Sequence, residues 1–265
     1  MKNILSNEFV YQIFALLLSV IVVHTIYVGA IRPNADAILE QQAELEARGG
    51  AYVPSRSLYV VLKDYEQETC FILMFWAIAI MAFKAKRILH QRALLQKRLL
   101  TISPGMSILP EDAREHSRAL QALPEEERDS LLPRALLTAL QRFGSTRSIQ
   151  DVATTIKEAC ESEAERLESE LAMVRYIAWA IPSIGFIGTV RGIGAALGQA
   201  HQAVEGDIAG VTASLGVAFN STFIALVISI LVMFLMQQVQ LLQDRLVLDS
   251  QQYCDTNLMY HLQVR

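Results

Sequence analysis

The sequence predicts an all-α membrane protein with four transmembrane helices and long cytoplasmic helical extensions. Apolar residues make up 52% of the 265 residues, and the mean hydropathy is +0.31. Most charged residues lie outside four apolar runs, and about 20 apolar residues are enough for a helix to cross a bilayer. The predicted spans lie within residues 1–31, 57–84, 175–198 and 209–236.

The first apolar run covers residues 9–31 and follows a short N-terminal segment. Lys2 before the run and Ala35-Asp36-Ala37 after it resemble the flanks of a cleaved signal peptide, which is the alternative interpretation. The run of about 23 residues is longer than the apolar part of a signal peptide, usually about 7 to 15 residues. We therefore expect an uncleaved membrane anchor.

The second apolar run, residues 69–83, is short by itself, and the apolar residues 57–62 extend it backwards. A basic cluster without acidic residues follows the run, and cytoplasmic flanks carry an excess of Lys and Arg. The loop 199–208 between the last two spans holds acidic residues and no Lys or Arg. We therefore expect both termini in the cytoplasm. The basic cluster consists of Lys84, Lys86, Arg87, Arg92, Lys97 and Arg98.

The same orientation places residues 32–56 outside the membrane. This segment contains a helix-compatible stretch from Asp36 to Arg48, which Gly49-Gly50 would end. It is too small to fold alone, and it could cover the outer rim or touch a partner.

The main cytoplasmic part is predicted at residues 85–174, where prolines divide the chain into short helices. Ser148 with Asp151 three residues later resembles a capping box that opens a long helix. That helix is expected to continue into the third span, with Pro182 as its only breaker, and residues 237–265 prolong the fourth span. An acidic row on the long helix is most simply a solvated face, although a cation vestibule is an alternative. The row consists of Glu158, Glu161, Glu163, Glu165, Glu168 and Glu170.

Other chemistries lack sequence support. Cys70 is expected near the outer membrane edge and Cys160 and Cys254 in the cytoplasm, so no intrachain disulfide is expected. Cys and His residues show no metal-ligand spacing. The chain has no P-loop, dinucleotide fingerprint or GxSxG motif. We therefore expect no enzyme activity, no cofactor, no bound metal and no nucleic-acid partner.

Ionisable groups inside a membrane span are functional candidates because their desolvation is costly. His24 lies within the first span, where it could relay protons or simply form an interhelical hydrogen bond. Arg191 lies past the midpoint of the third span, where it could extend to the interface or carry the charge of a pore mouth. His24 is the only group of the spans expected to titrate near neutral pH, so the main ion-binding group is expected from another chain.

Small and hydroxyl-bearing residues fill the third and fourth spans, and neither span contains Asp, Glu or Lys. Small residues let membrane helices approach closely, and buried hydroxyls can hydrogen-bond across the contact. The hydroxyls could merely hold the helices together, or they could form a polar ring that serves a partner's carboxylate. Thr189 and the triplet Asn220-Ser221-Thr222 are expected at similar depth, and Gly185, Gly188 and Gly192 surround Thr189.

The segments IPSIGFIGTVRGIGAAL and SLGVAFNSTFIALVISI resemble the two pore helices of the MotA/TolQ/ExbB proton-channel family. The matching features are the Gly-Thr pair in GFIGTVRGI and the Thr before an apolar triplet in NSTFIAL. Pro182 stands just before GFIGTV, like a proline of flagellar stator members. The resemblance is strong over about 60 residues, and four spans with a large domain between the second and third extend it to the flagellar-stator topology.

The resemblance implies a homopentamer in the bacterial inner membrane, surrounded by lipid and enclosing the single-span helices of a dimeric partner. That partner, similar to MotB, TolR or ExbD, would supply a membrane Asp, and proton transfer on it would power mechanical work. Thr189 and Thr222 would face this Asp, and Pro182 would act near the inner pore end. Asn220 and Val217 stand where related sequences often carry an acidic residue.

Two other functions are compatible with the residues alone. The first is a non-conducting oligomeric scaffold of an envelope machine. The second is a small ion transporter, although the spans lack the discontinuous helices and convergent charges typical of such sites. Neither the powered process nor the choice between protons and sodium follows from these residues.

Overall fold

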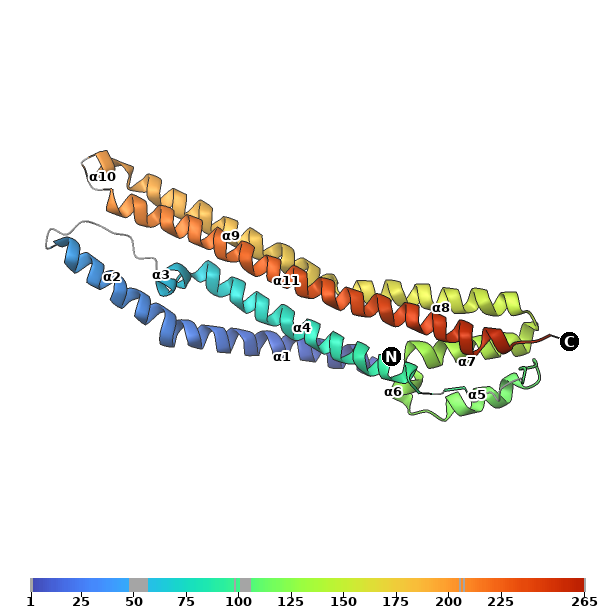
Figure 1. Ribbon diagram of the computed structural model, residues 1–265. Coiled ribbons are helices and arrows are strands. Elements are labelled where there is room, and N and C mark those ends of the chain that lie inside the picture. The colour runs from blue at the N-terminus through green and yellow to red at the C-terminus, as the bar shows by residue number, and fades with distance from the viewer. Residues whose placement is uncertain are drawn as a thin grey trace. The chain divides into compact units, whose positions relative to one another are not determined.

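The computed structural model describes residues 2–47, 57–97, 99–100, 106–204, 206 and 208–264 (Figure 1). This part of the chain is helical and contains no strand, only an isolated bridge between Ile108 and Leu262. Four of its helices are long and apolar enough to cross a membrane. The predicted all-α class is therefore confirmed for the described residues, and these four helices are candidates for the four predicted spans.

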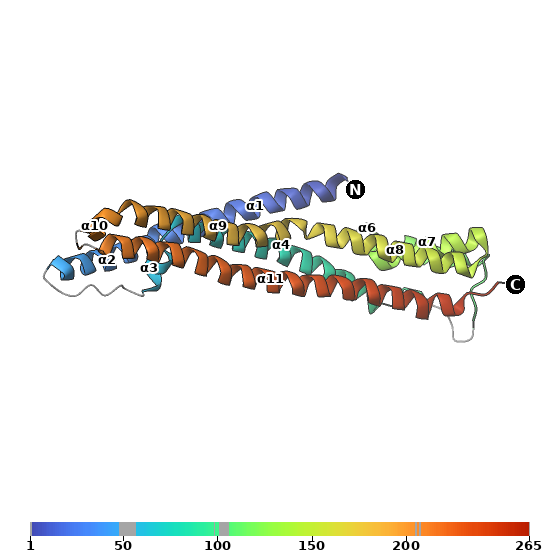
Figure 2. The same ribbon diagram turned by 90° about the horizontal axis from the view of Figure 1, so that it is seen from above.

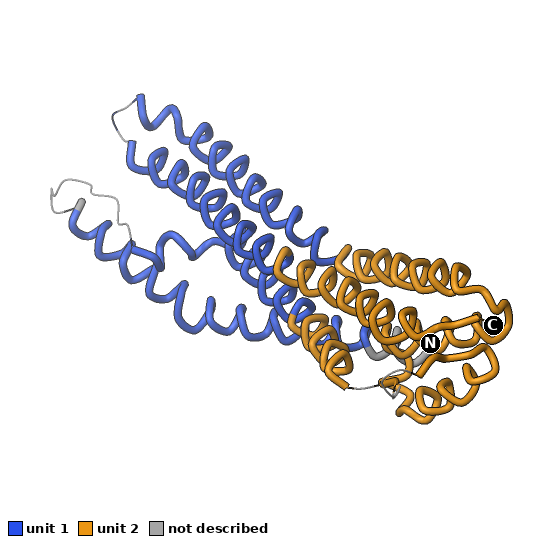
Figure 3. Tube along the Cα trace, turned by 45° about the vertical axis from the view of Figure 1, so that its right-hand side comes forward, with its two compact units in different colours: residues 1–81, 173–236 blue, residues 82–172, 237–265 orange. Residues whose placement is uncertain are grey.

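The chain divides into two compact units, coloured separately in Figure 3. Unit 1 comprises residues 1–81 and 173–236, and unit 2 comprises residues 82–172 and 237–265. The boundaries fall inside two long helices, α4 (Tyr65–Leu95) and α11 (Ala209–Asn257). Unit 1 therefore holds the predicted spans except residues 82–84, while unit 2 holds most of the predicted cytoplasmic part.

Unit 1 begins with a helix that continues beyond the predicted first span. The α-helix α1 (Lys2–Ile26) passes through the π-helical turn η1 (Tyr27–Ile31) into α2 (Arg32–Ala47). Pro33 has no N–H for the carbonyl four residues before it, and the wider turn just before Pro33 accommodates its ring. The helical stretch predicted from Asp36 thus begins at Arg32, and its predicted glycine stop lies outside the described residues.

The predicted second span is divided in two and is longer than expected. A short helix α3 (Leu58–Leu62) precedes α4, and Lys63 and Asp64 separate the two helices. Towards the C-terminus, α4 continues to Leu95 and includes Lys84, Lys86, Arg87 and Arg92 of the basic cluster. Trp76 Nε1 of α4 donates to Gln12 O of α1 at 2.9 Å, which ties the first two membrane helices together.

The two Gly-rich segments form α9 (Ala172–Gly198) and the first half of α11, joined by the short helix α10 (Ala200–Val204). Figure 2 shows α10 at the end of this pair. Pro182 lies inside α9 without ending it. The expected helix is instead interrupted at Leu171, between α8 (Ile149–Glu170) and α9.

Unit 2 is built around an apolar core shared by its helices and the end of α11. Leu136, Leu140, Phe143 and Ile156 are buried in this core. The predicted cap is confirmed, because Ser148 Oγ accepts a hydrogen bond from the Asp151 N–H at 3.2 Å. The other elements are α5 (Ala113–Gln121), α6 (Glu125–Arg128), α7 (Leu131–Thr146) and the 3-10 turn η2 (Met259–His261).

The acidic row of α8 is only partly a solvated face. Glu158, Glu161, Glu165 and Glu168 are exposed, as expected. Glu163, however, is 1% exposed. The period of the α8 helix turns Glu163 towards α7, and long-range pairing with a basic side chain makes its burial possible.

Two arginines hold the buried Glu163 carboxylate. Arg134 Nη2 of α7 lies 2.6 Å from Glu163 Oε2, and Arg166 Nε lies 3.0 Å from the same oxygen. Burial favours the neutral acid, but the hydrogen bonds and charges of Arg166 and Arg134 outweigh it and hold the pKa of Glu163 below its ordinary value. The carboxylate therefore stabilises unit 2 in its charged form.

We predict that Glu163→Gln lowers the free energy of unfolding by about 2 kcal/mol, because charge-assisted hydrogen bonds contribute about 1.5–3 kcal/mol. The measurement is denaturant unfolding of the full chain in detergent. Glu165→Gln on the exposed side of the same helix is the matched control and should change stability by less than about 0.5 kcal/mol. Equal effects of the two substitutions would contradict the buried ion pair.

Acid should remove the same stabilisation. Because the pKa of Glu163 is lower in the folded chain, its contribution is present above the ordinary Glu pKa of about 4.3 and is lost as pH falls through the folded value. The Glu163→Gln variant should consequently lose less stability than the parent chain between neutral pH and the onset of acid unfolding.

Candidate functional site

Close packing between α9 and α11 is the basis of the candidate site. A Cβ added to Gly185 would lie 2.4 Å from the Ala225 Cβ, and one added to Gly188 would lie 2.5 Å from the Ser221 Cβ. The same addition at Gly192 would lie 2.7 Å from the Ala218 N. Only glycine therefore permits this approach, as in other membrane helix pairs with small residues at their contact. These residues form the glycine seam: Gly185, Gly188 and Gly192 against Ala218, Ser221 and Ala225.

The glycine seam brings Thr189 and Thr222 together. Their Oγ1 atoms share a hydrogen bond. Thr189 Oγ1 also lies 3.1 Å from Ala218 O on α11, and Thr222 Oγ1 lies 3.1 Å from Gly185 O on α9. Both residues are half-buried. The expected similarity of depth thus extends to direct contact, and we call these two residues the hydroxyl pair.

The carbonyl that Pro182 leaves without its usual helical partner is satisfied by the neighbouring helix. Proline has no N–H to donate to the residue four positions before it, which is Ala178. Ser229 Oγ of α11 donates to Ala178 O at 3.1 Å. A polar group freed inside a membrane helix needs such a partner. Pro182 therefore supplies a further cross-link between α9 and α11, about two turns from Thr189.

Ser221 and Asn220 do not join the hydroxyl pair. Ser221 is buried and accepts a hydrogen bond from Gln67 Nε2 of α4 at 3.4 Å. Successive helix residues are about 100° apart, so Asn220 lies about 160° around α11 from Thr222. Of the polar residues predicted in the fourth span, the structure therefore places only Thr222 next to Thr189.

Arg191 is engaged by carboxylates of α4 and its preceding loop. Arg191 Nε lies 2.7 Å from Glu66 Oε1, its Nη2 lies 2.8 Å from Glu66 Oε2, and Asp64 Oδ1 lies 3.5 Å away. The two roles expected for Arg191, extension to the interface and a pore-mouth charge, stay predictions beside this observed contact. The contact is an ion pair that fastens α9 to α4 beside Gly188, whose added Cβ would lie 3.2 Å from the Glu66 Cγ.

Three consecutive residues in the first turn of α4 connect the helices of unit 1. Glu66 contacts α9, Gln67 contacts α11, and Glu68 contacts α1 and α2. Gln67 is fully buried and its Nε2 also donates to Val61 O at 3.1 Å. We call Glu66, Gln67 and Glu68 the polar turn. We expected His24 to be the only titratable candidate in the spans. Glu66 and Glu68 also lie within the predicted 57–84 span, and that expectation did not include them.

Large apolar side chains are exposed beside the hydroxyl pair. Phe186 and Ile193 of α9 and Phe219 and Phe223 of α11 are all exposed. Counting helix positions places them next to Thr189 and Thr222 and away from the side that contacts α4. In a membrane protein, this face is covered by lipid or by another membrane helix.

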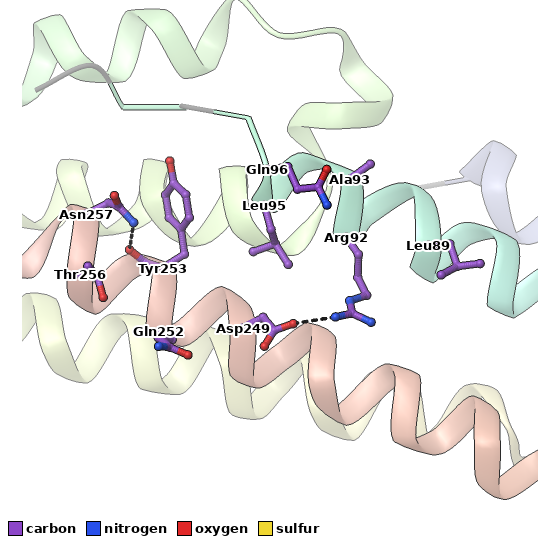
Figure 4. A pocket seen from close by; sticks show the side chains of 10 residues that line it. All are labelled: Leu89, Arg92, Ala93, Leu95, Gln96, Asp249, Gln252, Tyr253, Thr256 and Asn257. Carbon is purple, nitrogen blue, oxygen red and sulfur yellow. Dashed lines mark hydrogen bonds and ion pairs between the residues drawn. The ribbon is translucent and has the colours of Figure 1, made fainter.

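Unit 2 contains a groove of mixed polar and apolar lining. It has a volume of about 700 Å³ and lies between the ends of α4 and α11 (Figure 4). Arg92 and Asp249 form an ion pair across it at 3.0 Å, and Asn257 Nδ2 donates to Tyr253 O at 3.1 Å. Among the described residues, no group of His, Cys, Asp and Glu could hold a metal ion. The glycine seam and its hydroxyl pair remain the better candidate.

Comparison with known families assigns the region that contains this site. Residues 127–252 match the MotA/TolQ/ExbB proton channel family. This range includes α9, α10, most of α11 and the last helices of the segment before them. The family that the two Gly-rich segments predict is thus confirmed. Searches among curated proteins and among solved structures found no match.

We predict that Gly188→Ala destabilises the α9–α11 contact, whereas Gly194→Ala does not. The added methyl at position 188 meets Ser221, while an added Cβ at Gly194 has nothing within 4 Å. Overpacking costs about 1–3 kcal/mol, whereas the helix-propensity gain of about 1 kcal/mol is common to both substitutions. Thermal unfolding in detergent should therefore place Gly188→Ala below Gly194→Ala. Equal midpoints would show that the seam is not closely packed.

Proposed function

We propose, on the premise that residues 127–252 belong to the MotA/TolQ/ExbB proton channel family, that this chain is a proton-channel and motor subunit of the bacterial inner membrane. It couples the proton-motive force to mechanical work together with a single-span partner. The observation that carries the proposal is the hydroxyl pair, which lies inside the matched range at the closest approach of two membrane helices.

The hydroxyl pair has the chemistry that a proton pathway needs. A Thr hydroxyl donates one hydrogen bond and accepts up to two, so it can hydrogen-bond to a carboxylate, a carboxylic acid or water. Thr189 and Thr222 keep contacts to each other and to backbone carbonyls, which hold both oxygens in place. Their half-buried position at the edge of the seam leaves one side for a partner's group.

The proton-binding carboxylate is proposed to come from the partner. Residues 175–198 and 209–236 contain no Asp, Glu or Lys. Glu66 and Glu68 of the polar turn are already paired with Arg191 and Arg32. An Asp on the membrane helix of a partner similar to MotB, TolR or ExbD would complete the pathway against the hydroxyl pair.

The exposed apolar face beside the hydroxyl pair supports the proposed assembly. Five copies of this chain, arranged with α9 and α11 inside, would enclose the two helices of a dimeric partner. Protonation of each partner Asp would then advance the assembly by one step relative to the partner. The basic cluster after the second span supports the proposed orientation, with both termini in the cytoplasm.

We predict that Thr189→Ala and Thr222→Ala each reduce proton flux by about 10²-fold, the lower end of the effect of a positioned proton-transfer group. The measurement is flux into liposomes that contain this chain and its single-span partner. Thr212→Ala, at an exposed position of the same α11 helix, is the matched control and should keep the parent flux. Size-exclusion profiles of all variants should match the parent assembly.

Full flux in both site variants would show that the ion path lies elsewhere. Oligomers that form normally but carry no flux with the partner present would instead support a non-conducting scaffold. Flux without any partner would support a small ion transporter.

A further inference from the structure

A second cluster of ionisable groups lies in unit 1, apart from the hydroxyl pair. His24 Nδ1 of α1 lies 2.7 Å from Glu68 Oε1 of α4, and Arg32 Nη2 of α2 pairs with Glu68 Oε2. Each of the two carboxylate oxygens thus contacts a different basic side chain. The Glu68 side chain is 8% exposed, whereas the His24 side chain is 59% exposed.

The π-helical turn η1 explains how His24 and Arg32 reach the same carboxylate. In an α-helix, residues seven apart lie within about 20° of each other around the axis, whereas residues eight apart are separated by about 80°. A π-helical turn accommodates one extra residue, and the Arg32 N–H accordingly bonds to Tyr27 O, five residues before it. Arg32 therefore takes the position that the seventh residue after His24 would otherwise hold. Such turns occur frequently at functional sites.

Aromatic contacts help to hold Arg32 beside Glu68 Oε2. The Arg32 guanidinium lies 4.3 Å from the centroid of the Tyr65 ring and 5.7 Å from that of Tyr27. These cation–π contacts and the ion pair hold Arg32 on the Oε2 side of Glu68. Glu68 Oε1 remains for His24.

We propose that His24 and Glu68 form a proton-binding site of this chain, facing the outer compartment and separate from the hydroxyl pair. Neutral His24 donates its Nδ1–H to Glu68 Oε1, and the lone pair on Nε2 takes the incoming proton. No bond to Glu68 breaks, and the charge of the cluster rises by one. Histidine is the side-chain type that changes charge near neutral pH.

Several other ionisable groups surround His24 and Glu68. Glu68 brings a carboxylate to the site, and Arg32 brings a guanidinium. The other titratable groups near Glu68 and Arg32 are Tyr27 of η1, Tyr65 and Cys70 of α4, and Asp64 before α4.

The site also connects to the candidate pore helix. Glu68 and Glu66 lie in the same turn of α4, and Glu66 holds Arg191 of α9. Protonation of His24 changes the electrostatic interaction between α1 and the first turn of α4. On the basis of the proposed function, external acidity would thereby adjust proton flux through the adjacent pore.

The test is an NMR titration of the His24 imidazole in the full-length chain in lipid nanodiscs. The chain has five His residues, and the signal missing in His24→Gln identifies the site. Glu68→Gln should weaken proton affinity about tenfold, which is one pH unit, because an opposite charge at this range shifts a pKa by about 1–3 units. Arg32→Gln should strengthen the affinity, and Arg32→Lys should restore the parent midpoint. Glu40→Gln, at an exposed position of α2, is the matched control.

An unchanged midpoint in Glu68→Gln, or a shift of the same size in Glu40→Gln, would overturn the proposal. A flux assay distinguishes this failure from failure of the proposed function. His24→Gln should flatten the dependence of flux on outer pH between about pH 5 and 8. If the parent chain with its partner conducts no protons, the proposed function fails, while the titration still decides whether the His24 site exists.

Discussion

Inside a bilayer, α9 and α11 are held together without a hydrophobic driving force, because lipid tails are as apolar as the side chains they would replace. Their contact therefore depends on close packing and on hydrogen bonds between the helices. Glycine at positions 185, 188 and 192 removes the side chains that would separate the backbones. This approach then places Thr189 beside Thr222 and Ser229 beside the carbonyl that Pro182 leaves unpaired. The candidate site thus results from the glycine seam.

The polar turn of α4 extends this arrangement to the rest of unit 1. Three consecutive side chains of one helical turn point in different directions, since successive residues are about 100° apart. Glu66 consequently reaches α9, Gln67 reaches α11, and Glu68 reaches α1 and α2. Removing polar groups from water is costly, and each of the three side chains has a partner on another helix. The contacts of α1, α2 and α4 therefore help to fix the positions of α9 and α11, which carry the hydroxyl pair.

Local patterns in the sequence predicted the features that depend on neighbouring residues. The length of the apolar runs indicated the membrane helices, and Ser148 with Asp151 indicated a helix start. The grouping of glycine and threonine indicated a close helix contact. Pairings between distant helices have no such local signal, which is why the partners of Arg191 and Glu163 were not foreseen. Three acidic residues between two apolar runs, Asp64, Glu66 and Glu68, could have indicated a partner for Arg191.

Disulfide cross-linking tests most directly whether the glycine seam sets the position of the hydroxyl pair. Thr189→Cys with Thr222→Cys should oxidise rapidly in membranes, because side chains in contact fall within the short Cβ separation that a disulfide requires. Gly194→Cys with Thr222→Cys should remain unlinked, because an added Cβ at Gly194 has nothing within 4 Å. Equal cross-linking of the two pairs, or none in the first pair, would contradict the account.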